Sequence, residues 1–421
     1  MKMKYAKMMV AAAALTSATA MGAGFGLYEA SARGLGMGNG LVGSTGDASA
    51  NYYNPANLTE LSSPSVMVGM TLINPFCDVE VGNVQQQKMN AGWFPPPHVY
   101  VALPVMEDLV FGFGTYCEYG LGTKYDSDWA LKGDTTETTI QQFTLNPNLA
   151  YKVTEDWSVS FGARMSYLSF ENYKSPYFGV PTQYGMMDMY GRTKLKGDDF
   201  NCGYQLSTQY KVTDALSLGL VYRSRINHRV EGDFDLTTPE LLAAQGMVPP
   251  HVSGDAKAKL VLPASVTMGA NYDFTETFRG GASLTWTEWS TINHIDFNLP
   301  VNSYTQNLNW HDAWRIGFGF EYDLTDAFTG RIGYTFDWDP SADAHGTTML
   351  PPGDRHIIGF GASYKFLDNW RVDLGYSFII MESETRMVDV KNNATGTSNP
   401  HRFECDNSYS HLISASIAYT F

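Results

Sequence analysis

A seven-residue pattern recurs six times along the chain and predicts a series of tight turns. Each copy has a large apolar residue at both ends, an apolar residue at the third position and an acidic residue at the fifth. The polar centre suits a short chain reversal, and alternating apolar residues run away from it on both sides, as in β-hairpins. Large apolar residues at both shoulders indicate a ring at one level of a membrane. The six copies occupy residues 103–109, 151–157, 210–216, 272–278, 322–328 and 364–370.

The segments that flank these turns alternate with a period of two, which predicts strands. After the turn at 151–157, Trp157 and Phe161 share one face, whereas Ser158 and Ser160 lie on the other. Charged residues fall on the polar face, because a wet lumen tolerates them and lipid does not. We therefore expect the apolar face to point outward to lipid. The inward charges are Arg164, Arg223, Arg279, Arg315, Glu321, Arg331, Arg371 and Asp373.

The turn count predicts the architecture. Six turns join twelve strands, and residues 64–73 and 403–421 supply one more each, so we expect an all-β, 14-stranded antiparallel transmembrane β-barrel. An even number of strands with both termini in the periplasm is typical of a multi-pass protein of the Gram-negative cell outer membrane. Long outer loops are expected near residues 74–96, 116–138, 172–198, 231–254, 294–308, 338–353 and 384–402.

Two segments precede the barrel. Lysines, an apolar run and small residues follow one another at the start of the chain, which is typical of a signal peptide, assigned to residues 1–22. Residues 23–63 are glycine-rich, sparsely charged and too long for a simple lead-in. We expect them to form an N-terminal hatch inside the lumen, with the barrel over residues 64–421. The glycine run at 34–40 does not match a dinucleotide-binding loop, because it lacks the G-x-G-x-x-G spacing and a preceding strand.

Composition and motifs exclude several functions. The net charge of −15 argues against a nucleic-acid partner. The chain contains neither a His-Glu-x-x-His helix nor a Gly-x-Ser-x-Gly elbow, so we expect no enzyme, no metal and no cofactor. Cys77 and Cys117 could pair if both lie at the outer rim, or they could be small buried side chains. Both alternatives stay open.

Short motifs occur in order along nearly the whole mature chain. They are Ala-Gly-Phe at 23–25, Ser-Ala-Arg-Gly-Leu-Gly at 31–36, Asn-Pro-Ala at 54–56, Leu-Pro at 262–263, Thr-Glu-Trp-Ser at 287–290, Asp-Ala-Trp-Arg at 312–315, Pro-Gly-Asp-Arg at 352–355 and the Tyr-Thr-Phe end. In these motifs the chain resembles the FadL family of long-chain fatty acid transporters, which includes aromatic-hydrocarbon channels. The resemblance implies a hatch-plugged barrel that takes up hydrophobic small molecules passively. The ligand would settle among outer loops, reach an internal pocket near the mature N-terminus, and leave sideways into the membrane through a gap made by a kinked strand beside the Asn-Pro-Ala motif.

Two outer loops carry apolar residues that we expect to form a capture groove, because exposed apolar loops mark binding surfaces and Met and aromatic residues line adaptable pockets. Packing of loop against loop is the alternative. The predicted groove residues are Leu241, Leu242, Met247 and Val248 in one loop and Tyr177, Phe178, Met186 and Met187 in the other.

The resemblance also implies an internal site and a gate. Phe25 corresponds to a residue that the family places at the ligand, and Lys174 aligns by spacing with the family's carboxylate-pairing arginine; a solvated loop lysine is the alternative. A second basic residue is missing near Gln306, which makes a neutral aromatic or alkane ligand a competitor. Asn54, Pro55 and Ala56 are assigned to the gate, with plain turn chemistry as the alternative.

Partners follow from the same assignments. We expect a hydrophobic small-molecule ligand, outer-membrane lipid around the barrel, and the barrel-assembly machinery, because the last strand ends in the aromatic Phe421. A monomer is expected. A surface binding protein or adhesin, whose loops would contact another cell, is the alternative from a different class.

Overall fold

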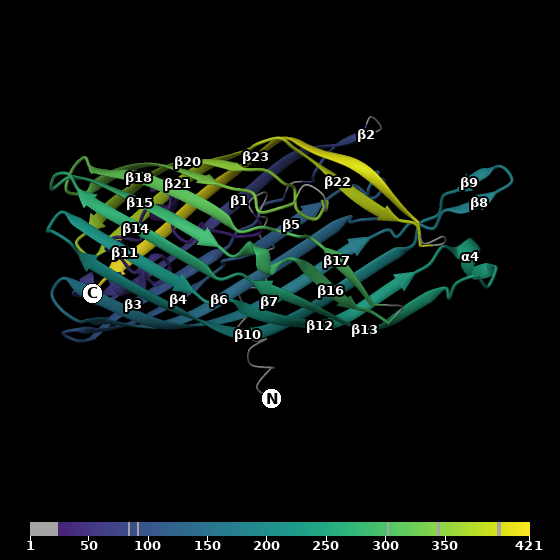
Figure 1. Ribbon diagram of the computed structural model, residues 1–421. Helices are drawn as coiled ribbons and strands as arrows, with labels where there is room; N and C mark the ends of the chain where they lie inside the picture. The colour runs from purple at the N-terminus through teal and green to yellow at the C-terminus, as the bar shows by residue number, and fades with distance from the viewer. Residues whose placement is uncertain (1–23, 83–84, 91, 301–302, 343–345, 394–396) are drawn as a thin grey trace.

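Fourteen antiparallel strands form a closed barrel in the computed structural model, which describes residues 24–421 apart from 83–84, 91, 301–302, 343–345 and 394–396 (Figure 1). The first and last strands pair from Ser65 opposite Thr420 to Val81 opposite Phe403, which closes the wall. The predicted strand number is confirmed; the proposed signal peptide lies outside the described residues. The wall strands are β1 (Ser65–Val81), β3 (Pro97–Met106), β4 (Leu109–Tyr116), β6 (Glu137–Lys152), β7 (Trp157–Lys174), β10 (Arg192–Lys211), β11 (Leu216–Arg223), β14 (Ser265–Asp273), β15 (Phe278–Thr287), β18 (Ala313–Asp323), β19 (Phe328–Asp337), β20 (Arg355–Leu367), β21 (Trp370–Met381) and β23 (Ser398–Thr420).

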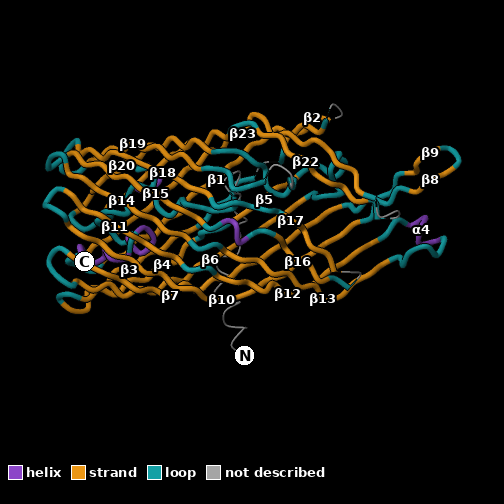
Figure 2. The backbone as a smooth tube through the Cα atoms, in the orientation of Figure 1, coloured by secondary structure: helices purple, strands orange, loops and turns teal. Residues whose placement is uncertain are grey.

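Additional strands lie toward the end of the barrel opposite the C-terminus, and all but β8 and β9 belong to the same sheet as the wall (Figure 2). Much of the predicted outer loop at 231–254 is therefore strand, because β12 and β13 pair along their whole length. The loop at 172–198 likewise carries its own hairpin, formed by β8 and β9. These additional strands are β2 (Gln85–Lys88), β5 (Gly120–Lys124), β8 (Val180–Thr182), β9 (Gly185–Met187), β12 (Ile226–Thr237), β13 (His251–Leu262), β16 (His294–Asn298), β17 (Ser303–Asn307) and β22 (Glu384–Lys391).

The wall shows the alternation that the sequence predicts. Trp157 and Phe161 are exposed on the outer surface, whereas Ser158 and Ser160 are buried inside. The recurring threonine at the fourth position of the turn pattern has a defined role. The Thr154 hydroxyl accepts a hydrogen bond from the Trp157 amide at 3.1 Å, and equivalent bonds of 3.0 Å recur at Thr213, Thr275 and Thr325. These four turns are thus closed by a side chain as well as by backbone bonds.

Residues 24–63 are largely buried and contact the inner wall on several sides. They include α2 (Ala32–Gly36), which contacts β20 and β21, α3 (Ala50–Tyr53), which contacts β4, and the 3₁₀ helix η1 (Pro55–Glu60), which contacts β6, β7 and β10. None of the helices in the described residues is long and apolar enough to cross a membrane. This placement is consistent with a hatch, and we use that name for residues 24–63 below.

Glycines on the wall let the hatch backbone lie directly against the strands. A Cβ added at Gly281 would lie 1.9 Å from the Gly40 carbonyl oxygen, and one at Gly317 would lie 2.0 Å from that of Gly38. Any other residue at these two positions would push the hatch inward. The close approach of two backbones therefore explains why glycine recurs on the inner face of strands that otherwise carry polar side chains.

Buried ion pairs fasten the hatch to the wall. The Arg33 guanidinium donates to Glu321 at 3.0 Å, and Arg371 donates to Asp47 at 2.8 Å. Arg279 and Arg331 also donate to Glu321, whose side chain is 1% exposed. Burial alone would raise the pKa of the Asp47 carboxyl. The positive charges of Arg371 and Arg33 instead hold that pKa below its usual range. We call Arg33, Asp47, Glu321 and Arg371 the hatch anchor.

Candidate ligand-binding site

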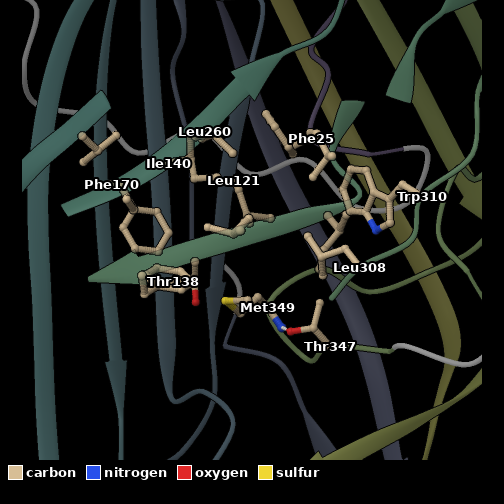
Figure 3. Close-up of a pocket in the computed structure, with 16 residues that line it drawn as sticks. Phe25, Leu121, Thr138, Ile140, Phe170, Leu260, Leu308, Trp310, Thr347 and Met349 are labelled. Atoms are coloured by element: carbon tan, nitrogen blue, oxygen red, sulfur yellow. Dashed lines mark hydrogen bonds between the residues drawn. The ribbon is translucent and has the colours of Figure 1, made fainter. Parts of the chain in front are cut away.

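An apolar pocket lies inside the outer part of the barrel (Figure 3). Its walls come from β5, β6, β7, β12, β13 and β16, so segments distant in sequence meet here. Within the part of the chain that the structure describes, no charged side chain lines it. The hydroxyls of Thr138 and Thr347 bond elsewhere, to Asn172 and Asp134 respectively. The lining residues are Phe25, Leu121, Thr138, Ile140, Phe170, Val230, Ala258, Leu260, Ile292, Ile295, Phe297, Leu308, Trp310, Thr347, Met349 and Leu350.

Phe25, the first aromatic residue of the hatch, enters this pocket from below. Its ring centroid lies 5.1 Å from that of Trp289, 5.6 Å from that of Tyr119 and 6.0 Å from that of Trp310. These tilted and edge-on contacts are the arrangement that aromatic rings prefer. The four residues form an aromatic floor under the pocket. Phe25 thus lies at the base of an apolar cavity, and its assignment to ligand binding stays a prediction.

Lys174 lies elsewhere. It ends β7, where it pairs with Thr193 of β10, and it is not among the residues that line the pocket. The structure therefore does not bring Phe25 and Lys174 together in one cavity. The pocket that contains Phe25 suits an uncharged ring or alkyl chain, because it offers apolar contact without a charged or free polar partner.

A short roof segment, residues 347–350, covers the pocket from the outer side. Asp134 holds it: the carboxylate accepts from the Thr348 amide at 2.8 Å and from the Thr348 hydroxyl at 2.6 Å. The Thr123 hydroxyl donates to the Met349 carbonyl at 2.8 Å. The Tyr125 hydroxyl donates to the Thr348 carbonyl at 2.9 Å. Together these bonds hold the roof segment over the pocket.

A second, polar chamber begins on the other side of the aromatic floor. Tyr119 and Trp289 line it together with Glu118, Arg223 and Arg315. Glu118 is neutralised by Arg164 at 2.7 Å and by Arg223 at 3.4 Å. The Arg315 guanidinium carbon lies 3.4 Å from the centre of the Tyr28 ring, which belongs to the hatch. A ligand with a carboxylate would find its cationic partners here and not in the apolar pocket.

The wall is irregular beside this chamber. Tyr116 of β4 pairs with Thr144 of β6, whereas Gly120 of β5 pairs with Gln141, so the strand gains one residue between them. On the other side, the pairing of β3 with β4 ends at Val99 and Thr115. We call residues 117–119 the interrupted strand. Such bulges bend a strand and end its pairing locally.

Hatch residues take the place of the missing strand neighbour. The Leu27 amide donates to the Glu118 carbonyl at 2.8 Å, and the Gly120 amide donates to the Phe25 carbonyl at 2.9 Å. Gly26 stands directly opposite Tyr119 in this short antiparallel bridge. The segment that carries Phe25 therefore covers the interrupted strand from inside, and one movement would change both the pocket and the wall.

The Asn54-Pro55-Ala56 motif lies against a different part of the wall. The Asn54 side-chain oxygen accepts from the Ala56 amide at 3.1 Å and so caps η1, while its amide group donates to the carbonyls of Val42 and Thr208. The Ala56 amide also lies 3.0 Å from the Ser207 hydroxyl of β10. The motif thus combines the turn chemistry considered from the sequence with an attachment of the hatch to the wall.

The predicted outer groove is only partly exposed. Leu241, Met247, Met186 and Met187 are exposed, and Tyr177 and Val248 are half-buried. The expectation that Leu242 is exposed is wrong: Leu242 of α4 (Glu240–Ala244) and Phe178 are buried, because they turn inward to pack their own loops. Arg192 pairs with Thr237, so the bases of the two loops are adjacent. Both project from the outer end of the barrel (Figure 1).

Three polar residues, two of them buried, have the hydrogen-bond order of a hydrolase triad. His228 Nδ1 lies 3.0 Å from the Asp199 carboxylate, and His228 Nε2 lies 3.1 Å from the Ser166 hydroxyl. Ser166 and His228 are fully buried, and neither lines the pocket or the polar chamber. A nucleophile needs access to its substrate. We interpret the three residues as a hydrogen-bonded link between β7, β10 and β12.

The closed antiparallel barrel, its lipid-facing apolar surface and the filled lumen define an outer-membrane transport barrel. Comparison with known proteins gives the family. Residues 13–421 match the model of the outer membrane protein transport family (OMPP1/FadL/TodX), and the chain belongs to that family.

Relatives and solved structures agree with this assignment. The chain is 27% identical to a 47 kDa outer membrane protein of Pasteurella multocida, over 88% of this chain and 90% of the relative. It is 23% identical to the long-chain fatty acid transport protein of Escherichia coli strain K12, over 87% and 90%. The crystal structure of a Pseudomonas aeruginosa FadL homologue superimposes with a TM-score of 0.85 at 19% identity, covering 94% of this chain and all 100% of that one.

Proposed function

We propose that this protein lets a hydrophobic small molecule cross the outer membrane by passive diffusion and releases it sideways into the lipid. The single observation that carries the proposal is the uncharged apolar pocket inside an otherwise polar lumen. Transfer of a methylene group from water to an apolar phase is favourable by about 0.8 kcal/mol. A route that stays apolar and ends in lipid is therefore downhill.

The interrupted strand supplies the place for sideways release. Residues 117–119 border the polar chamber, and their backbone bonds go to hatch residues 25–27 instead of to β3. Withdrawal of those hatch residues would connect pocket, chamber and lipid in one step. Asn54, Pro55 and Ala56 would serve this gate indirectly, by fixing the other end of the hatch to β10.

Two ligand classes remain, and the two cavities separate them. A neutral aromatic hydrocarbon, as named for the toluene transporter TodX of Pseudomonas putida, fits the apolar pocket alone. A fatty acid would have to place its carboxylate in the polar chamber near Arg223 or Arg315, with its chain through the aromatic floor. The pocket itself favours the neutral class, because its lining offers no counter-charge.

Filling the pocket tests the proposal. In Ala258→Trp, the new ring occupies the cavity, so the dissociation constant for a bound hydrocarbon rises at least about tenfold, equal to ~1.4 kcal/mol. Retention of radiolabelled naphthalene and palmitate by the purified barrel in detergent measures it. Lys259→Trp is the matched control, since Lys259 is exposed on the same strand. Equal binding by both variants would contradict the proposal.

The exposed loop residues test capture separately from binding. Leu241→Asp combined with Met247→Asp places charges on the exposed side of α4 and its following turn. We expect uptake by whole cells to slow several-fold while the affinity of the purified protein for the same ligand is unchanged, because the pocket is intact. An unchanged uptake rate would assign these loops a role other than capture.

A further inference from the structure

Two buried cysteines meet across the seam that closes the barrel. Cys77 lies in β1 and Cys405 in β23, and the register places Val79 opposite Cys405. Both side chains point inward, with exposed fractions of 2% for Cys77 and 0% for Cys405. They belong to the same apolar cluster as Val79 and Phe403. Sequence separation is large, but strand closure makes the two residues neighbours.

The pairing of β1 with β23 is irregular beside the two cysteines. The register shifts between Phe76, opposite Tyr409, and Asp78, opposite Asp406, so β23 carries an extra residue. Asn407 provides it in a left-handed conformation with φ 46°. Such a bulge increases the local twist. The Cys405 thiol lies within hydrogen-bond reach of the Cys77 thiol, and Tyr125 is adjacent to both.

The other two cysteines have no comparable arrangement. Cys117 belongs to the interrupted strand, and Cys202 is exposed on the outer wall. All four are free thiols in the structure, and the two alternatives for Cys77 and Cys117, a disulfide or small buried side chains, stay open. Closure of the barrel by β1 and β23 makes Cys405 the cysteine adjacent to Cys77.

We propose that Cys77 and Cys405 form a disulfide that covalently joins the first and last strands of the barrel. Outer-membrane proteins pass through the periplasm, where disulfides form and persist. The Cys77 and Cys405 thiols lose two protons and two electrons, and one sulfur–sulfur bond forms. The oxidant is the disulfide of a periplasmic thiol oxidase, which breaks to a dithiol through a mixed-disulfide intermediate.

The bond fixes the seam while leaving the rest of the wall free. It lies next to the aromatic cluster of Phe76, Tyr409 and His411, whose rings contact one another across β1 and β23. The interrupted strand, in contrast, carries no such bond. The covalent bond keeps β1 paired with β23 while residues 117–119 move.

Peptide mapping tests the inference on the natural protein. Whole cells are treated with N-ethylmaleimide before lysis. The protein is then purified, digested and analysed by mass spectrometry without reduction. We expect a cross-linked peptide pair that contains Cys77 and Cys405, and an alkylated Cys202. Recovery of Cys77 and Cys405 as free thiols, alkylated only after denaturation, would overturn the inference, as would a peptide that joins Cys77 to Cys117.

Variants give an independent readout. Cys77→Ser and Cys405→Ser should each lower the temperature of the heat-induced mobility shift by several degrees, and the double variant should lower it no further, because both remove the same bond. A reductant should lower the transition temperature of the wild type to that of the variants. Cys202→Ser is the matched control. Two results would contradict a disulfide. One is a double variant whose transition temperature falls by the sum of the two single effects; the other is a wild type whose transition temperature is the same with and without reductant, when the reductant is added to the unfolded protein before refolding.

Discussion

Replacing Glu321 with alanine should convert the closed barrel into a leaky pore. Glu321 receives Arg33 from the hatch and Arg279 and Arg331 from the wall, and it is buried. Removing one partner of a buried ion pair typically costs about 3–5 kcal/mol, because the remaining charges stay desolvated. Displacement of Arg33, and of the hatch with it, exposes this charge to water and so removes most of the energetic cost. We expect single channels in planar bilayers to show a conductance at least about tenfold above the wild type.

The control and the supporting variant separate this effect from general damage. Glu288→Ala removes a carboxylate that pairs with Arg225 on the outer wall, away from the hatch, and should leave conductance unchanged. Asp47→Ala alters the hatch side of the anchor without touching any strand, so it should raise conductance even if Glu321→Ala fails to fold. Wild-type conductance in both anchor variants would show that the hatch is held by packing alone.

A cross-link between the hatch and the interrupted strand should abolish transport. Gly26 and Tyr119 are directly opposed, and the hydrogen bonds that flank them make this the closely spaced type of antiparallel pair, with Cα atoms about 4.5 Å apart. That separation suits a disulfide. In Gly26→Cys with Tyr119→Cys, in a background of Cys117→Ser and Cys202→Ser, uptake should fall at least about tenfold under oxidising conditions and recover with a reductant.

The background protein without the two new cysteines is the control for the effect of the reductant. Tyr119→Ser in the same background is the control for loss of the Tyr119 ring. A cross-linked protein that transports at the rate of its reduced form would place the route elsewhere. The Cys77–Cys405 seam would then become the obvious place to look for an opening, and the same reductant titration on the background protein would show whether it contributes.

How much of this molecule could be predicted differs between wall and interior. The turn pattern and the two-residue period predict the barrel, because successive wall residues alternate between lipid on the outside and water or the hatch on the inside. Trp157 and Ser158 show it directly. The interior obeys no such rule. Arg33 and Glu321 are far apart in sequence, and nothing local marks them as partners.

The site illustrates the same limit. Phe25 could be assigned only through the resemblance, whereas Phe297 of its pocket lies in a segment expected to be a loop, and Val230 borders another. The alternation of Val230 and Leu260 with the exposed Arg229 and Lys259 predicts strands whose apolar side chains face the interior, and such side chains line a cavity or a core. Leu242 failed for the opposite reason: a short helix on a loop buries one of its two leucines, and the sequence does not say which.

The most direct test of the account is to ask where the ligand resides. The protein in lipid vesicles is loaded with a diazirine-bearing alkylbenzene, irradiated, digested and analysed by mass spectrometry, with and without excess unlabelled compound. The account predicts competed labelling of Phe25, Trp310 and residues near the interrupted strand at 117–119. Labelling confined to lipid-facing residues such as Phe161, unaffected by competitor, would contradict it.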